Sequence, residues 1–334
     1  MFDGASILVT GGTGSLGQAL IRSLLTDHKP QRVIVYSRDE LKQHEMQVST
    51  CFSNDSRIRY FIGDVRDVRR LEMALRGVDY VVHTAALKQV PAAEYNPFEC
   101  IHTNVLGAEN VVQASLNSDV KKVITLSTDK AANPVNLYGA SKLASDKIFV
   151  AANHLSGSSG ARFSVVRYGN VLGSRGSVVP IFIRLKNEKA KFIPITDFRM
   201  TRFWITLQAS VDFVLSCISM MRGGEVFVPK IPSMRVVDLA SIIAPELEQQ
   251  EVGIRPGEKL HEVLIPEDEA RCTVEFSDRY IIEPEHLLIW EKGYYLKEGG
   301  KSVSSEFSYA SNNNNRFLDR DEIEKYLRQA NLEL

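Results

Sequence analysis

The sequence is short of cysteine, of excess charge of one sign and of long apolar runs. Its four cysteines, Cys51, Cys100, Cys217 and Cys272, form no C-x-x-C pair, and no histidine flanks them at a zinc-ligand interval. These spacings argue against a disulfide framework and a metal site, so we expect free thiols in a reducing compartment. No apolar run approaches the roughly 20 residues that cross a bilayer, and the first residues lack a signal-peptide pattern. We therefore expect a cytoplasmic protein without a membrane partner.

The charges are almost balanced, with 40 basic and 41 acidic residues and a net charge of −1. Nucleic-acid-binding domains usually carry a basic excess, so this balance argues against a nucleic-acid partner. A local basic pocket for a phosphate stays compatible with it. With 334 residues, 44% of them hydrophobic, the chain can bury a core without disulfide or metal staples.

The first half alternates short β-rich runs with helical patterns. The runs 6–10, 32–36, 58–62, 80–83, 123–127 and 163–168 are β-branched and are typical of buried strands. Helical patterns lie between them, for instance over 15–25, 97–117 and 138–153. This alternation predicts parallel strands joined by right-handed helical crossovers, which is a doubly wound α/β fold.

After Tyr168 the alternation of strands and helices becomes less regular, and Gly and Pro interrupt the chain. We therefore expect a main domain over 1–170 and a smaller mixed α/β cap over 171–334, with some later segments returning to the main domain. Near the end, Asp319 and Asp321 predict the start of a helix that runs to Gln329, because acidic side chains suit the positive end of a helix.

A glycine-rich loop joins the first predicted strand to the first predicted helix. Its G-x-x-G-x-x-G spacing is a weak signal alone, but the strand before it and the helix after it are the context that supports it. The glycines permit a tight turn and close approach of a pyrophosphate, and the helix N-terminus offers N–H groups to that anion. An ordinary glycine-rich turn is the alternative. The pattern predicts a Rossmann-type dinucleotide site formed by Gly11, Thr13, Gly14, Ser15, Leu16 and Gly17.

The end of the second strand bears on which dinucleotide binds. An NAD site places Asp or Glu there, against the ribose hydroxyls. This chain has Ser37 followed by Arg38, whose planar fork of donors suits a phosphate. We therefore expect NADP, with Lys42 as a second cation. The alternative is a solvated Arg38, with Asp39 on the ribose.

Two further strand ends suit the flat parts of such a cofactor. Asp64 and Val65 follow the third strand, where they fit an adenine amino group and ring face. Ala85 follows the fourth strand, where a small side chain lets a flat ring pass. Core packing is the alternative for the alanine.

Tyr138 and Lys142 lie at i and i+4, so they share one face of a predicted helix. A free phenol has a pKa of about 10, and a nearby ammonium lowers that pKa towards the range of a general base. Because the pair follows a dinucleotide loop and a fifth strand, the chain resembles the extended short-chain dehydrogenase/reductase superfamily. That resemblance implies that Thr128 assists the pair, and that Thr103-Asn104 and Asn110 support the site.

Asp129 and Lys130 follow at the end of the fifth strand. An acid and an amine in tandem are surplus to hydride transfer. They suit a second reaction, in which a proton beside a carbonyl is removed and a neighbouring hydroxyl leaves. A solvated acid and amine at a strand end are the alternative, and the nearby tyrosine–lysine pair favours the chemical interpretation.

Longer segments carry a closer resemblance. They are 127–134 (STDKAANP), 136–142 (NLYGASK), 167–171 (RYGNV), 173–180 (GSRGSVVP), 201–204 (TRFW) and 253–259 (GIRPGEK). They resemble the UDP-N-acetylglucosamine 4,6-dehydratases that invert carbon 5 and open the pathway to pseudaminic acid, and the similarity covers essentially the whole chain. Related retaining dehydratases carry Asp-Glu in place of Asp129-Lys130, and membrane-anchored relatives have a transmembrane portion not found in this sequence.

The resemblance implies a lyase reaction in three parts. Tyr138, ionised by Lys142, takes the carbon-4 hydroxyl proton while the carbon-4 hydride passes to NADP+. Lys130 removes the carbon-5 proton, which the 4-ketone acidifies, and Asp129 protonates the departing carbon-6 hydroxyl. The hydride returns to carbon 6 and carbon 5 is reprotonated on its other face, giving UDP-2-acetamido-2,6-dideoxy-β-L-arabino-hex-4-ulose. These roles predict a lowered pKa at Lys130 and a raised pKa at Asp129.

The same resemblance places the nucleotide-sugar substrate, UDP-N-acetylglucosamine, against the cap. Arg202 and Arg255 suit its two phosphates because arginine binds phosphate bidentately, and Glu258 suits a ribose hydroxyl. The other implied neighbours are Lys88, Asn170, Val178, Val179 and Thr201. For any one of these residues, a surface salt bridge or a loop anchor is the alternative.

Two other functions stay open at this point. A nucleotide-sugar 4-epimerase would use the tyrosine–lysine pair with NAD but would not need Asp129 and Lys130. A non-catalytic NADP-sensing protein would keep the glycine loop without needing Tyr138 and Lys142. The family is commonly oligomeric, which implies a homo-oligomer.

Overall fold

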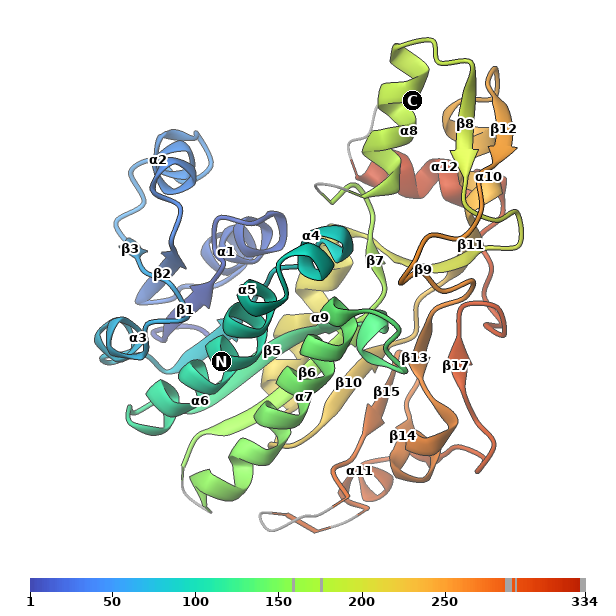
Figure 1. Ribbon diagram of the computed structural model, residues 1–334. Helices are drawn as coiled ribbons and strands as arrows, with labels where there is room; N and C mark the ends of the chain where they lie inside the picture. Colours follow the sequence, from blue (N-terminus) through green and yellow to red (C-terminus); the bar gives the residue numbers. More distant parts are fainter. Residues whose placement is uncertain (158–159, 175–176, 286–289, 292, 331–334) are drawn as a thin grey trace.

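The computed structural model describes residues 1–157, 160–174, 177–285, 290–291 and 293–330 (Figure 1). Arg175 and Gly176 of the segment 173–180 lie outside these residues. The described residues form one large sheet, in the order β16-β14-β15-β10-β6-β5-β4-β1-β2-β3, and a smaller group of elements beside it. No helix in this part of the chain is long and apolar enough to cross a membrane.

The strands predicted in the first half form the parallel part of the large sheet. They are β1 (Ser6–Thr10), β2 (Arg32–Ser37), β3 (Ile58–Ile62), β4 (Tyr80–His83), β5 (Lys122–Thr128) and β6 (Arg162–Tyr168). All neighbouring pairs among them are parallel, and their order, 3-2-1-4-5-6, is that of dinucleotide-binding sheets. The predicted doubly wound Rossmann-type fold is therefore confirmed.

Helices cover both faces of the parallel strands (Figure 1). On one face α1 (Ser15–Asp27) packs against α9 (Leu207–Met220). On the other face lie α3 (Val68–Ala74), α6 (Gly107–Leu116) and α7 (Leu137–Ser156), each packed against the next. Covering both faces buries the strands and accounts for their apolar sequences. The remaining helices of this half are α2 (Glu40–Val48), α4 (Val90–Tyr95) and α5 (Pro97–Ile101).

The helix predicted over 97–117 is interrupted by a π-helical turn at His102–Leu106. Such a turn inserts one extra residue into a helix and is frequent at functional sites. Here Asn104 is buried, and its amide oxygen accepts from the Leu87 N–H at 2.8 Å. Its amide nitrogen donates to the Leu87 carbonyl and to the Ser141 hydroxyl, both at 2.9 Å. The turn therefore fixes the loop after β4 against α7.

Several later strands extend the large sheet beyond β6. They are β10 (Val226–Pro229), β14 (Thr273–Glu275), β15 (Arg279–Ile282) and β16 (Lys301–Ser302). Strand β10 runs parallel to β6, whereas β15, β14 and β16 pair in antiparallel fashion. These four strands have only two to four residues each, and such short runs leave a weak periodic pattern, so the sequence did not predict them.

The smaller group of elements has its own apolar core. It contains α8 (Val178–Asn187), β8 (Phe192–Ile195), α10 (Val236–Ile243), β12 (Glu248–Glu251) and α12 (Arg320–Gln329), seen at the upper right of Figure 1. Phe182, Trp204 and Leu327 are among its buried side chains. Helix α12 begins where expected, with a capping box between Asp319 and Glu322.

Short strands connect this group with the large sheet. Strand β9 (Thr201–Ile205) pairs with β7 (Asn170–Val171), which follows β6 directly, and with β11 (Ser233–Arg235). A second small pair consists of β13 (Val263–Ile265) and β17 (Tyr309–Ala310), with α11 (Tyr294–Lys297) nearby in the chain. Strands β9 and β13 bring the segment 255–262 beside the end of β5 (Figure 1).

Candidate active site

A cavity of about 1060 Å³ lies between the carboxyl ends of the parallel strands and the smaller group of elements. Open α/β sheets bind ligands at this edge. Most residues singled out in the sequence line it: Gly11, Thr13, Gly14, Ser15, Leu16, Gly17, Ser37, Arg38, Lys42, Asp64, Val65, Ala85, Lys88, Thr128, Lys130, Tyr138, Lys142, Asn170, Val178, Arg202, Arg255 and Glu258. The fold therefore gathers both halves of the expected site around one space.

Asp129, Val179 and Thr201 do not line the cavity. Val179 is fully buried in the core of the smaller group, because it lies on the face of α8 opposite its neighbour at the cavity. The Thr201 hydroxyl is hydrogen-bonded to His261 Nδ1 and to the Ser311 hydroxyl, both at 2.7 Å. Neither side chain reaches the cavity, and contact of these two residues with the substrate stays a prediction.

Residues larger than glycine would clash with neighbouring atoms in the glycine loop. Gly11 has φ +65°, and a Cβ there would lie 2.8 Å from the Thr84 hydroxyl. A Cβ on Gly17 would lie 2.6 Å from the Gly11 carbonyl oxygen. Helix α1 starts after Gly14 without a side-chain cap, so its first N–H groups face the loop. These features fit the pyrophosphate of a dinucleotide.

The end of β2 presents cations to the same cavity. Arg38 is 53% exposed and its guanidinium lies 3.5 Å from the Asp64 carboxylate. Asp39 caps α2 by accepting from the Lys42 N–H at 3.0 Å, and its carboxylate pairs with the Lys42 ammonium at 2.7 Å. The Ser37 hydroxyl is hydrogen-bonded to the Thr13 hydroxyl at 2.9 Å, which joins β2 to the glycine loop.

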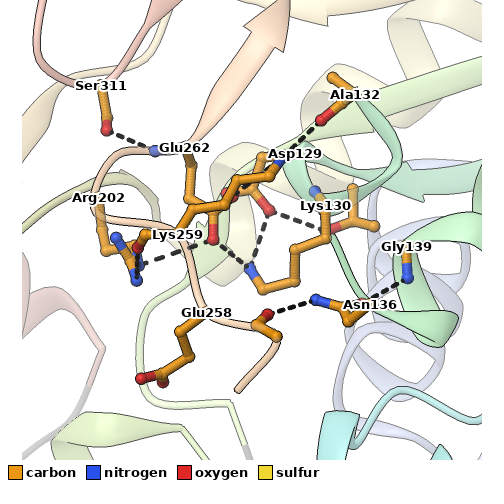
Figure 2. A network of polar contacts seen from close by, with 12 residues as sticks. Asp129, Lys130, Ala132, Asn136, Gly139, Arg202, Glu258, Lys259, Glu262 and Ser311 are labelled. Atoms are coloured by element: carbon orange, nitrogen blue, oxygen red, sulfur yellow. Dashed lines mark hydrogen bonds and ion pairs between the residues drawn. The ribbon is translucent and has the colours of Figure 1, made fainter. Parts of the chain in front are cut away.

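The first turn of α7 carries Tyr138 into the cavity. Its cap, Asn136, accepts from the Gly139 N–H at 2.7 Å and donates to the Gly257 carbonyl at 2.7 Å, which ties the helix to the segment 255–262 (Figure 2). A Cβ on Gly139 would lie 2.1 Å from the Lys130 carbonyl oxygen. This close approach places Tyr138 and Lys130 at the same wall of the cavity.

The electrostatics of the tyrosine–lysine pair differ from the expectation. Burial raises the pKa of Tyr138 to about 12, and this effect exceeds the lowering by Lys130 and by hydrogen bonding to Thr128. Burial also lowers the pKa of Lys142, against the attraction of Asp146. In the protein alone the phenol pKa is therefore raised rather than lowered, because the cost of burying charge dominates.

Asp129 and Lys130 form a buried pair at the end of β5. The Asp129 side chain is 0% exposed, and its Oδ1 accepts from the Lys130 amine at 3.0 Å and from the Thr128 hydroxyl at 2.9 Å. Its other oxygen, Oδ2, is buried without a hydrogen bond. Lys130 itself lines the cavity. The alternative of a solvated acid and amine at a strand end is therefore excluded.

The pKa of Lys130 moves opposite to the expectation. Burial lowers it, but the carboxylates of Asp129 and Glu262 together outweigh burial, so the pKa is raised. The roles implied by the resemblance predicted a lowered pKa, whereas the fold supplies two carboxylates that outweigh burial and Arg202. In the protein alone the amine is therefore held as an ammonium.

Glu262 is the main member of the site that the sequence did not reveal. Its side chain is 3% exposed, and its carboxylate lies 3.4 Å from the Lys130 amine (Figure 2). It also lies 3.8 Å from Arg202 Nε and 3.8 Å from the Lys259 amine. Its position three residues after the segment 253–259 could have marked it as a site residue, but nothing in that spacing indicates that its side chain is buried.

Arg202 is less available for a phosphate than the sequence suggested. Its Nη1 donates to the Thr201 carbonyl at 2.7 Å and to the Leu260 carbonyl at 3.1 Å, and its Nη2 donates to the Lys259 carbonyl at 2.9 Å. Arg255 instead lies at an exposed edge of the cavity, paired with Glu258. Arg255 is therefore the better placed of the two for bidentate binding.

Comparisons with known proteins agree with this arrangement. The family described as "Polysaccharide biosynthesis protein" matches residues 7–284. The inverting UDP-N-acetylglucosamine 4,6-dehydratase of Campylobacter jejuni serotype O:23/36 is 55% identical over 327 residues, which cover 97% of each chain. A UDP-glucose 4-epimerase of Rickettsia conorii is 38% identical over 98% of this chain and 96% of its own.

A solved structure, Pen from Bacillus thuringiensis, superposes with a TM-score of 0.89 at 34% identity, covering 100% of this chain and 99% of its own. The match thus extends over both the large sheet and the smaller group of elements. The chain therefore belongs to the polysaccharide biosynthesis protein family, within the extended short-chain dehydrogenases/reductases.

Proposed function

We propose that this protein is a UDP-N-acetylglucosamine 4,6-dehydratase that inverts carbon 5, a lyase. The observation that carries the proposal is the Asp129–Lys130 pair, joined at 3.0 Å, whose lysine lines the same cavity as Tyr138 while the aspartate is buried behind it. A redox enzyme alone has no use for a buried acid and amine beside its tyrosine. The relative that is 55% identical carries this activity in its name, which supports the proposal.

The proposed cofactor is NADP, held by the glycine loop with its phosphate at Arg38 and Lys42. Asp39 also lines the cavity, but its carboxylate caps α2 and pairs with Lys42, whereas the Arg38 guanidinium is 53% exposed. Asp64, Val65 and Ala85 then border the adenine and the passage to the nicotinamide. When bound, the nicotinamide accepts the carbon-4 hydride and returns it to carbon 6.

Tyr138 is the proposed base for the carbon-4 hydroxyl. Lys142, buried on the same face of α7, supplies the positive charge that favours the phenolate. Thr128 lies beside the phenol and orients the sugar hydroxyl. The phenol pKa is about 12 in the protein alone, and the Lys130 charge and the hydrogen bond with Thr128 are the contacts of this chain that lower it.

Lys130 and Asp129 are the proposed base and acid for the elimination. Moving one proton across their 3.0 Å hydrogen bond gives a neutral amine and a protonated carboxyl without exchange with solvent. The amine then takes the carbon-5 proton, and the carboxyl gives its proton to the departing carbon-6 hydroxyl. The pair returns to the ion pair in which it began. A solvent proton then adds to carbon 5 on its other face, and Tyr138 releases to solvent the proton it took from the carbon-4 hydroxyl, so the protons balance.

The smaller group of elements, with its surrounding segment 171–334, is proposed to bind the nucleotide sugar. Arg255 contacts the diphosphate and Glu258 a ribose hydroxyl. Lys88, Asn170 and Val178 line the part of the cavity between that end and Tyr138. The product then serves pseudaminic acid synthesis in the cytoplasm.

We further propose a homo-oligomer that buries α4 and α5. Tyr95 and Phe98 on these helices are 87% and 77% exposed, which is unusual for large apolar side chains close together in the chain. Light scattering of the purified protein tests this proposal, and a monomer at micromolar concentration would contradict it.

The test of function is incubation with UDP-N-acetylglucosamine in heavy water. A product lighter by one water, with deuterium at carbon 5 and inverted configuration there, supports the proposal. Lys130→Ala should abolish deuterium incorporation while leaving cofactor binding intact. A product of unchanged mass with inverted carbon 4 would identify an epimerase, and no turnover of any nucleotide sugar would favour a sensing protein.

A further inference from the structure

Glu262 is a buried carboxylate to which the steps above assign no role. It follows the loop that carries Arg255 and precedes β13, so it comes from a part of the chain remote from β5. Its backbone N–H donates to the Ser311 hydroxyl at 3.0 Å, and its carbonyl accepts from the Ser311 N–H at 2.8 Å. These bonds fix the residue at the cavity wall with its carboxylate towards Lys130 (Figure 2).

The Lys130 amine is the cation closest to this carboxylate. Glu262 Oε1 lies 3.4 Å from the amine, against 3.8 Å from Arg202 Nε. Its second oxygen, Oε2, is buried without a hydrogen bond and lies 3.8 Å from the Lys259 amine. The charged and titratable groups that face Lys130 are thus Asp129, Tyr138, Arg202, Lys259 and Glu262.

We propose that Glu262 is a positioning residue for the elimination step, which holds the Lys130 amine between two carboxylates and keeps it protonated between turnovers. Lys259 and Arg202 also lie beside the Glu262 carboxylate and partly neutralise its charge, which weakens its attraction for the Lys130 amine. This inference rests on the proposed role of Lys130 as the carbon-5 base.

A second carboxylate restricts the position of the Lys130 amine more than Asp129 alone does. A lysine side chain has a long flexible stem, and one contact leaves its amine free to swing. Two carboxylates on different elements fix the amine from two sides. The second carboxylate also opposes loss of the proton, because an opposite charge within about 4–6 Å typically shifts a pKa by about 1–3 units.

The test uses exchange of the carbon-5 proton of the 4-keto product in heavy water, a step that needs no hydride transfer. Proton transfer to Asp129 gives a rate that does not depend on pH. Above that plateau the rate rises with pH as Lys130 loses its proton to solvent, and the position of that rise reports the charge around the amine. In Glu262→Gln the rise should move to lower pH by about one unit or more. In Lys259→Met, which removes a cation, it should move to higher pH.

Glu275→Gln is the matched control, since Glu275 pairs with Lys230 at 2.6 Å away from the cavity. Its profile should equal that of the wild type. A merely structural role for Glu262 would lower the rate and the melting temperature at every pH without moving the rise. A folded Glu262→Gln with an unmoved profile overturns the inference.

Two variants, Glu262→Gln and Lys259→Met, keep the inference testable if one of them does not fold. If Glu262→Gln does not fold, an upward shift in Lys259→Met supports the inference and an unmoved profile overturns it. If Lys130→Ala retains carbon-5 exchange, the proposed base is wrong and this inference falls with it. If Lys130→Ala abolishes exchange while Glu262→Gln has the wild-type profile, only the role of Glu262 fails.

Discussion

Replacement of Arg38 tests which dinucleotide the protein binds. Arg38 is 53% exposed and already lies 3.5 Å from Asp64, so part of its charge is compensated before any phosphate arrives. A hydrogen bond to a charged group contributes about 1.5–3 kcal/mol, and solvent screening places this one at the lower end. Arg38→Ala should therefore weaken NADP+ binding by about 1.5 kcal/mol, which is about tenfold.

The measurement is titration of NADP+ and NAD+ by isothermal calorimetry at two salt concentrations. NAD+ affinity should change by no more than about twofold, because NAD+ lacks the phosphate. The loss for NADP+ should shrink at high salt, since exposed charges are screened within about 10 Å at 0.1 M ionic strength. Arg69→Ala, which removes an exposed arginine of α3 outside the cavity, is the control.

The reasoning is refuted if Arg38→Ala weakens both dinucleotides equally, because Arg38 would then act on a part that they share. It is also refuted if NADP+ affinity does not change. In that event Asp39 would have to leave its cap and bind the ribose of NAD+.

Three other perturbations follow from the site and its core. Gly17→Ala should weaken dinucleotide binding at least tenfold in the same titration, because the new Cβ would lie 2.6 Å from the Gly11 carbonyl oxygen; unchanged affinity would contradict the proposed fit. Tyr138→Phe should lower kcat by about 10²–10⁴ in a coupled turnover assay while dinucleotide affinity stays the same, and near-normal kcat would remove the tyrosine from its role. His83 has its pKa lowered to about 3, first by burial and then by Lys142. Below about pH 6.5 the histidine is protonated in the unfolded chain but stays neutral in the native state. The free energy of unfolding therefore decreases as the pH is lowered, by up to about 2 kcal/mol at pH 5. Urea unfolding at pH 7.5 and 5.0 should show a smaller pH dependence in His83→Asn, and equal dependence in both proteins would refute it.

Much of the fold followed from local patterns. The parallel strands are short, apolar and β-branched because helices cover both of their faces, and such runs are readily recognised. The glycine loop was recognisable because tight turns and close approaches admit only glycine. The later strands β10, β14, β15 and β16 were missed, since their pairing depends on partners distant in the chain.

Some residues of the candidate site were likewise recognisable from the sequence, and others were placed only by the fold. Tyr138, Lys142, Asp129 and Lys130 lie within one short stretch, so their spacing carried chemical information by itself. The sequence could not separate Val178 from Val179, because neighbouring residues on a helix face different directions and only the packing of α8 decides which side chain reaches the cavity.

By itself, then, the amino-acid order determined the doubly wound scaffold and the identity of the two titratable pairs, because both depend on residues close together in the chain. Only the tertiary structure decided the charge on those pairs. It buries Tyr138, and it brings Glu262 from a distant loop to 3.4 Å from the Lys130 amine. The pKa of an ionisable group depends on burial and on charges within a few ångströms, and those neighbours come from the folded chain rather than from the adjacent sequence.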